Sequence, residues 1–331
     1  MVDLHHHGDR DVRDGLLDLA VNVYAGPRPA WLDAALRAGI ESAGAYPNPS
    51  EAEAVTAARH GRAAGEVLAT AGAAEAFTLI ARWRRWRRPV VVHPQFTEPH
   101  AALSTAGHSV HEVVLEPPFE LDPERIPDDA DLVVLGNPTN PTGVMHPAAA
   151  VRALRREGRM VVVDEAFMDT EPGEPESVAH VPDVLVLRSL TKQWGIPGIR
   201  AGYVLGDEER VRELRTLQPP WSVSSPAIAA MLACGSVQAR AESERRAHQM
   251  QAWRRHLENG LHGLGIAHIP SRASFVLARV GVGVRTNLRE RGIAVRRGDT
   301  FPGLDDNWIR IAVRDERSTD IFLTGLVDAL R

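Results

Sequence analysis

The stretch Val184-Leu185-Val186-Leu187-Arg188-Ser189-Leu190-Thr191-Lys192 joins a continuous apolar run to the only lysine of the chain. Such a run is typical of a strand buried on both faces, as in a parallel sheet covered by helices. Lys192 would then follow the carboxyl end of a strand, where ligands bind in open α/β sheets. Lysine can lose its proton and attack a carbonyl to form an imine, so Lys192 is a candidate nucleophile.

The choice of basic residues supports this interpretation. Lys and Arg total 38, and since one of them is Lys192, the other 37 are arginine. Arginine stays protonated in proteins and is no nucleophile. The alternative is that compositional drift left one lysine on the surface, and the surrounding residues decide between the two.

Apolar runs and helical stretches alternate along residues 45–220. Runs like that of 184–187 occur at 90–93, 132–135 and 160–163, separated by helical candidates at 73–85, 147–156 and 209–217. This alternation predicts an α/β domain. Residues 221–331 predict a smaller α/β domain: a long helix over 226–264, strands at 275–280, 293–295 and 308–313, and helices at 286–291 and 318–330. We assign residues 1–44 to an N-terminal arm and part of the smaller domain.

Composition narrows the class of protein. Apolar content of 44% and charged content of 24% are ordinary for a globular protein, and a net charge of −5 does not suggest a general polyanion binder. The lone Cys234 excludes an intrachain disulfide and a cysteine-rich zinc site. No run has the apolar length of a membrane span or signal segment. We expect a cytoplasmic protein without nucleic-acid, membrane or metal binding, and we interpret the Arg/Trp-rich run 82–88 as a helix end.

Groups with distinct chemistry follow four of the expected strands. The turn Ala71-Gly72-Ala73-Ala74 follows a short expected strand at 68–70 and opens a helix, whose N-terminus suits a phosphate. Asn140, Asp164 and Lys192 follow three other strands, and Ser189 and Arg200 flank the lysine. Each feature alone has an ordinary explanation as a turn, a helix cap, a metal ligand or a solvated charge. Their order and spacing together with the unique lysine favour a single site.

These groups together fit pyridoxal 5′-phosphate. An amine is needed to form the imine, and a carboxylate keeps the pyridine nitrogen protonated so that the ring accepts electrons. An amide that donates to the ring phenolate favours its ionised form. Hydroxyl groups, an arginine and a helix N-terminus are suited to the phosphate.

The same motifs, in the same order, resemble those of the class I/II aminotransferase family, the fold type I pyridoxal-phosphate enzymes. They are Asn140-Pro141-Thr142-Gly143, Asp164-Glu165-Ala166 and Ser189-Leu190-Thr191-Lys192 through Arg200. The resemblance implies a large domain with a mostly parallel sheet flanked by helices, plus a smaller α/β C-terminal domain.

The resemblance also implies roles for individual residues. Lys192 would be the Schiff-base lysine and proton shuttle, Asp164 would pair with the pyridine nitrogen, and Asn140 would bond the ring oxygen. The remaining cofactor positions would be Phe96, which would stack on the ring, and the phosphate ligands Ser189, Arg200 and the backbone of Ala73 and Ala74. Tyr46 matches a tyrosine that reaches the neighbouring subunit's cofactor, which implies a homodimer.

Within the family, several segments are similar to the threonine-phosphate decarboxylase branch of cobalamin biosynthesis, whose near relative is histidinol-phosphate aminotransferase. Phe167 stands where most aminotransferases of this type place a tyrosine, and the decarboxylase branch often has phenylalanine there. The segments are His7-Gly8-Asp9, 196–203, 220–223, 301–304 and 309–314. Departures near the substrate side are Pro99, Thr170, Ser224 and the segment 22–26, and they put the substrate in doubt.

The substrate side is expected to carry arginine, whose planar fork binds a carboxylate bidentately. Arg310 matches the family's carboxylate arginine, Arg296 matches a second arginine often used for a distal phosphate, and Asn22 is a further candidate contact. Among 37 arginines, a surface role for Arg296 is the alternative.

Three functions follow. The first is decarboxylation of a small phosphorylated amino acid, most simply threonine phosphate. The second is transamination of histidinol phosphate or another amino acid. The third is a non-catalytic regulatory protein that binds pyridoxal phosphate. The first two functions differ in the bond at the substrate Cα that lies perpendicular to the cofactor ring: the C–H bond in transamination and the bond to the carboxylate in decarboxylation. The sequence does not determine the orientation of these bonds.

Overall fold

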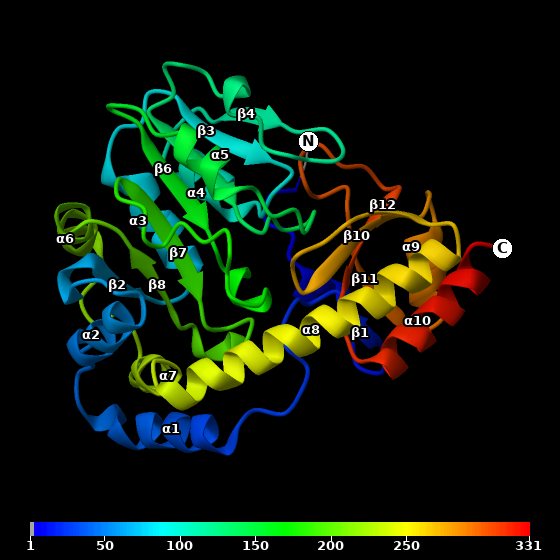
Figure 1. The fold of residues 1–331 in the computed structure, drawn as a ribbon, viewed down its shortest axis with the longest axis horizontal. Coiled ribbons are helices and arrows are strands. Elements are labelled where there is room, and N and C mark those ends of the chain that lie inside the picture. Colours follow the sequence, from blue (N-terminus) through cyan, green and yellow to red (C-terminus); the bar gives the residue numbers. More distant parts are fainter. Residues whose placement is uncertain (1–2) are drawn as a thin grey trace.

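The computed structural model describes residues 3–331 and contains two sheets (Figure 1). The larger sheet is mixed, and all its neighbouring strands are parallel except β8, which runs antiparallel to both β2 and β7. Its seven strands lie in the order β2 (Val67–Thr70), β8 (Gly202–Leu205), β7 (Val184–Ser189), β6 (Met160–Asp164), β5 (Leu132–Gly136), β3 (Pro89–His93) and β4 (His111–Val114). The four predicted apolar runs are therefore strands of one helix-covered sheet, as expected.

Alternating side chains of the central strands enter two different cores. On β6, for example, Val161 and Val163 belong to one cluster, whereas Met160 and Val162 belong to the other. One face is covered by α1 (Ala30–Glu41), α2 (Ser50–Arg59), α5 (Ala148–Ala153) and α7 (Ser225–Cys234), and the other by α3 (Ala73–Trp83), α4 (Glu98–Thr105) and α6 (Glu208–Leu217). Burial on both faces explains why these strands lack polar alternation.

The smaller sheet joins the two ends of the chain. Its strands lie in the order β1 (Leu17–Leu19), β11 (Ile293–Arg297), β12 (Trp308–Ala312), β10 (Phe275–Arg279) and β9 (Ala267–Ile269). Leu17 pairs with Ile293 in parallel, so the N-terminal segment completes a sheet made by C-terminal residues. Helices α9 (Val284–Glu290) and α10 (Glu316–Ala329) cover this sheet.

The expected continuous helix over 226–264 is wrong, because two helices occupy that stretch. Helix α7 ends at Cys234, and α8 (Val237–Gly263) begins after Gly235 and Ser236. The hydroxyl of Ser236 accepts a hydrogen bond from the backbone N–H of Ala239 at 3.1 Å, as expected for an N-cap. In Figure 1, α8 extends from beside α7 to the smaller sheet and so connects the two halves.

Two further differences concern short elements. The helix expected over 73–85 ends at Trp83, while the buried indole of Trp86 donates to the carbonyl of Ile80 at 2.9 Å. Strands β1, β4, β8 and β9 have no counterpart among the expected elements, because runs of three or four residues carry too little periodicity. Within residues 3–331, none of the helices combines the length and apolarity that crossing a bilayer requires.

Candidate active site

A cavity of about 550 Å³ lies at the carboxyl ends of the large-sheet strands and is closed by residues of the smaller sheet. Eleven of the twelve side chains or backbone positions predicted for the site line this cavity. They are Asn22, Ala73, Ala74, Phe96, Asn140, Asp164, Ser189, Lys192, Arg200, Arg296 and Arg310. Predicted site residues that are far apart in the sequence therefore lie together in one cavity. Tyr46 is the exception.

One end of the cavity has the shape and charge expected of a phosphate cradle. Gly72 precedes α3 with φ 79° and ψ 174°, a conformation that essentially only glycine adopts. A Cβ at Gly72 would lie 2.5 Å from a guanidinium nitrogen of Arg200, so the arginine packs directly against this turn. Ser189 and Thr191 add hydroxyl groups whose oxygens are 2.7 Å apart. Ala73 and Ala74, the first two residues of α3, line the same cavity, and the first N–H groups of a helix have no acceptor within it. Together these donors suit a phosphate dianion.

Asp164, the last residue of β6, also lines the cavity. Its Oδ1 accepts a hydrogen bond from the backbone N–H of Ala166 at 3.0 Å, which fixes the carboxylate. Burial raises the pKa of Asp164 to about 6, against the opposing effects of the Ala166 N–H and Lys192. A buried carboxylate that gains from a nearby cation is suited to hold the proton of a pyridine nitrogen.

Lys192 lies in the turn after β7, where its backbone carbonyl accepts a hydrogen bond from Tyr24 N at 2.9 Å. Burial, then Arg310 and Arg200, lower the pKa of Lys192 to about 8, while Asp164 opposes the shift. A substantial fraction of the amine is therefore unprotonated near neutral pH, as a nucleophile requires. Its Nζ lies 5.9 Å from the centroid of the Phe167 ring.

Arg310 is buried and held by three acceptors. It donates to Asn140 Oδ1 at 2.5 Å and to the carbonyl of Ala20 at 2.6 Å. In the orientation that satisfies its amide, Asn22 accepts from Arg310 Nε and Nη1 at 3.1 Å. Since the oxygen of Asn140 is used by Arg310, its Nδ2 is the group that can donate to a cofactor ring oxygen.

Arg296 is also buried, so the surface alternative for it is wrong. It donates to the carbonyl of His6 at 2.7 Å, lies 3.5 Å from Asp11 Oδ2, and places its guanidinium 4.8 Å from the Phe301 ring centroid. Its Nη1 has no hydrogen-bond partner among the described residues. Burial lowers the pKa of Arg296 to about 10, which leaves the side chain protonated at neutral pH.

Arg296 and Arg310 are directly opposed residues of the antiparallel strands β11 and β12. Like charges that face each other across strands destabilise a sheet. Burial and then the charge of Arg296 lower the pKa of Arg310 well below its ordinary value, yet arginine remains protonated in proteins. Two buried cations on the same cavity wall indicate a binding site for an anion.

The N-terminal segment contributes cavity residues that have no predicted role in the site. His6, His7 and Asp9 line the cavity, and His7 Nε2 lies 2.7 Å from Glu98 Oε1. The hydrogen bond from His7 is the main reason that the pKa of Glu98 is lowered. Glu98 has no distinguishing sequence signal, because a carboxylate at a helix start is ordinary and its partner is remote in the chain.

Tyr46 does not line the cavity. Its side chain is 77% exposed and stacks on Trp221, itself 60% exposed, with ring centroids 4.3 Å apart. The described chain therefore presents two neighbouring aromatic rings to the outside, and the role predicted for Tyr46 requires a second copy of the chain.

Comparison with known proteins identifies the family. The family model for aminotransferase class I and II matches residues 14–326. This chain belongs to that family. The interpretation as fold type I pyridoxal-phosphate enzyme is thus confirmed, and pyridoxal 5′-phosphate is the cofactor. Membership also makes the chain an aminotransferase or lyase, in place of the non-catalytic alternative.

Individual proteins of the family are similar to this chain over most of its length. A histidinol-phosphate aminotransferase of Mycobacterium tuberculosis is 46% identical over 318 residues, which cover 94% of this chain and 87% of the relative. A threonine-phosphate decarboxylase of Salmonella typhimurium is 28% identical and covers 96% and 92%. The solved histidinol-phosphate aminotransferase of Clostridium acetobutylicum superposes with a TM-score of 0.87 at 24% identity, covering 95% and 99%. That last likeness concerns the fold.

Proposed function

We propose that the protein is an aminotransferase of the histidinol-phosphate type. The observation that carries the proposal is the opposed pair Arg296 and Arg310, buried on the cavity wall that faces Lys192. Histidinol phosphate carries its amine close to a phosphate ester, so an anion bound by the arginines would place the amine toward the lysine. The relative with the highest identity given above bears this activity in its name.

The chain's own residues would divide the work as follows. Pyridoxal phosphate, when bound, supplies an electron sink for the pair of electrons released at the substrate Cα. Asp164 would hold the proton of the ring nitrogen, and Asn140 Nδ2 would donate to the ring oxygen. Gly72, Arg200 and Ser189 would hold the phosphate. Lys192 Nζ is unprotonated for part of the time near neutral pH. It would carry the proton between the substrate Cα and the cofactor carbon.

A second candidate is decarboxylation of a phosphorylated amino acid such as threonine phosphate, the function that the sequence motifs favour first. The specific observation for it is Phe167, which lines the cavity near Lys192 and offers no hydroxyl to the ring oxygen. Two arginines could also divide between a carboxylate and a phosphate. We rank it second because the histidinol-phosphate aminotransferase of Mycobacterium tuberculosis is 46% identical to this chain and the threonine-phosphate decarboxylase of Salmonella typhimurium is 28% identical.

Product analysis separates the two functions. Purified protein loaded with pyridoxal phosphate is given histidinol phosphate with 2-oxoglutarate, or threonine phosphate alone. Glutamate formation from the first mixture supports the proposal. Release of carbon dioxide from the second, with no glutamate from the first, would replace the proposal by the decarboxylase.

We also propose that the protein works as a homodimer in which Tyr46 reaches the cofactor phosphate of the other subunit. Support comes from the exposed stack of Tyr46 on Trp221, which a second copy would cover. Sedimentation should give twice the chain mass of 36.1 kDa. A wild-type protein that sediments as a monomer would contradict this arrangement. So would a Tyr46→Phe variant that binds pyridoxal phosphate as tightly as the wild-type protein does.

A further inference from the structure

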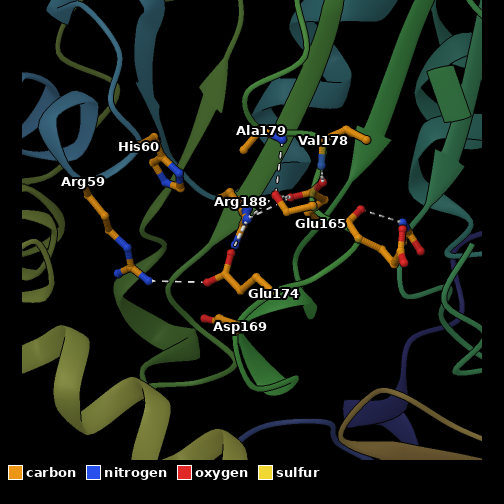
Figure 2. Close-up of polar contacts among 12 residues, drawn as sticks. Arg59, His60, Glu165, Asp169, Glu174, Val178, Ala179 and Arg188 are labelled. Atoms are coloured by element: carbon orange, nitrogen blue, oxygen red, sulfur yellow. Dashed lines mark hydrogen bonds and ion pairs between the residues drawn. The ribbon is translucent and has the colours of Figure 1, made fainter. Parts of the chain in front are cut away.

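A buried group of charged side chains lies next to the cofactor-binding positions but does not line the cavity (Figure 2). At its centre is Arg188, whose side chain is 4% exposed. One guanidinium nitrogen of Arg188 lies 2.8 Å from Glu165 Oε2 and 2.5 Å from Glu174 Oε2. The family motif includes Glu165, yet the proposed chemistry gives it no role.

Sequence neighbours place this pair directly behind the site. Glu165 follows Asp164 at the end of β6, and Arg188 precedes Ser189 at the end of β7. Successive side chains of an extended segment point to opposite sides. Asp164 and Ser189 line the cavity, and Glu165 and Arg188 meet on the other side.

Backbone pairing holds the ends of β6 and β7 side by side. Asp164 is paired with Leu187, and the N–H of Glu165 donates to the carbonyl of Leu187 at 2.9 Å. The ion pair between Glu165 and Arg188 thus spans the two strands one residue beyond Asp164 and one before Ser189.

The second carboxylate oxygen of Glu165 and its surroundings are also fixed. Glu165 Oε1 accepts from the backbone N–H of Val178 at 2.7 Å, and Oε2, the oxygen paired with Arg188, accepts from the Ser177 hydroxyl at 2.8 Å. Although burial acts to raise it, Arg188 and Arg59 hold the pKa of Glu174 at about 2, so this carboxylate stays charged. Arg188, 4% exposed, is therefore the cation shared by the buried Glu165 and the part-exposed Glu174.

We propose that Glu165 and Arg188 are positioning residues which set the separation between the pyridine-nitrogen partner Asp164 and the phosphate ligand Ser189. The proposal rests on the proposed roles of those two residues. It assigns a role to a motif residue that touches neither cofactor nor substrate. Outer-shell partners of this kind are known to affect bound groups by about 10-fold to 100-fold when they are lost.

The test compares Arg188→Met, Glu165→Gln and the double variant with the wild-type protein. Two quantities are measured: the Kd for pyridoxal phosphate, by fluorescence quenching, and the visible circular dichroism per bound cofactor. The second reports how rigidly the protein orients an achiral ring, and a general loss of stability does not alter it.

Arg188→Met leaves the buried carboxylate of Glu165 without its cation, whereas the part-exposed Glu174 keeps Arg59 at 3.8 Å. We therefore expect a Kd raised about tenfold or more and a reduced dichroic band. Adding Glu165→Gln removes one uncompensated charge and should restore part of both signals. The matched control is Arg159→Met, a buried arginine at the other end of β6 that donates to the carbonyls of Ala130 and Leu154. It should leave both signals unchanged.

Wild-type affinity and dichroism in Arg188→Met would overturn the proposal, as would equal losses in Arg159→Met. If Arg188→Met does not fold, Arg188→Lys decides, because it keeps the charge but loses the planar fork. It should weaken binding and dichroism, and an unchanged result there also overturns the proposal. Failure of the wild-type protein to bind pyridoxal phosphate would instead refute the site itself.

Discussion

Replacing Gly72 by alanine should have two separate effects. It should strain the backbone before α3, and it should displace the side chain of Arg200. The backbone has φ 79° and ψ 174°, and holding alanine there costs about 1–3 kcal/mol. The added Cβ would lie 2.5 Å from a guanidinium nitrogen of Arg200. Since that atom belongs to the end of a flexible side chain, we expect the arginine to move away from the turn.

The displacement should weaken cofactor binding by a calculable amount. A hydrogen bond to a charged group contributes about 1.5–3 kcal/mol. Losing one such bond between Arg200 and the phosphate corresponds to a Kd for pyridoxal phosphate that is about 10-fold to 150-fold higher. Unfolding in urea should show the backbone cost in the cofactor-free protein, and equilibrium titration should show the loss of affinity.

Two further variants make the reasoning refutable. Gly158→Ala introduces alanine at φ 74° with no atom within 4 Å of the new Cβ, so it should lower stability without affecting cofactor affinity. Arg200→Ala removes the displaced group, and Gly72→Ala on that background should have a much smaller effect on affinity. If Gly72→Ala binds pyridoxal phosphate like the wild-type protein, Arg200 does not hold the phosphate in the way the cavity indicates.

Three other predictions concern titrating groups and charge. Borohydride should trap the cofactor on Lys192, and Lys192→Ala should abolish the trapped product. The rate of imine formation by the cofactor-free protein should rise with pH and level off above about 8, whereas a rate that still rises toward 10.5 would contradict the lowered pKa. Burial raises the pKa of Asp169 from 3.8 to about 7, so its stabilising contribution is complete below 3.8 and lost as pH rises through 7. Urea unfolding of Asp169→Asn should therefore show a gain over wild type of up to about 1.4 kcal/mol per pH unit between pH 5 and 7, and a pH-independent difference would refute it. Arg310→Met should raise KM for the anionic substrate far more than Arg279→Met at an exposed site of the same sheet, and equal KM values would exclude Arg310 from the substrate site.

Sequence reasoning succeeded where a local pattern and a general rule of sheets were enough. Continuous apolar runs identified β3, β5, β6 and β7, and the rule that ligands bind beyond strand ends brought Asn140, Asp164 and Lys192 into one cavity. Arg296 and Arg310 came from the family motif instead. Their direct opposition across β11 and β12 depends on strand register, which the sequence does not state.

What could not be predicted depends on contacts between remote segments. The parallel pairing of β1 with β11 brings His6, His7 and Asp9 to the cavity, and three residues of strand give no periodic signal. The break between α7 and α8 lies at Gly235 and Ser236. Ser236 caps the start of α8 through its hydrogen bond from Ala239 N–H. The first miss follows from tertiary pairing without a local signal, whereas the second overlooked a local helix stop and start signal at Gly235 and Ser236.

The near absence of lysine acquires a physical meaning in this cavity. Arg200, Arg296 and Arg310 supply a positive field that attracts anions, and their guanidinium groups keep their protons. The charges of Arg310 and Arg200 also lower the pKa of Lys192, so the same field that binds phosphate or carboxylate frees the amine to react. A lysine in place of either arginine could lose its own proton and would weaken both effects. One titratable cation among permanent ones therefore combines anion binding with activation of a single nucleophile, and binding of an anion between Arg296 and Arg310 should in turn raise the pKa of Lys192.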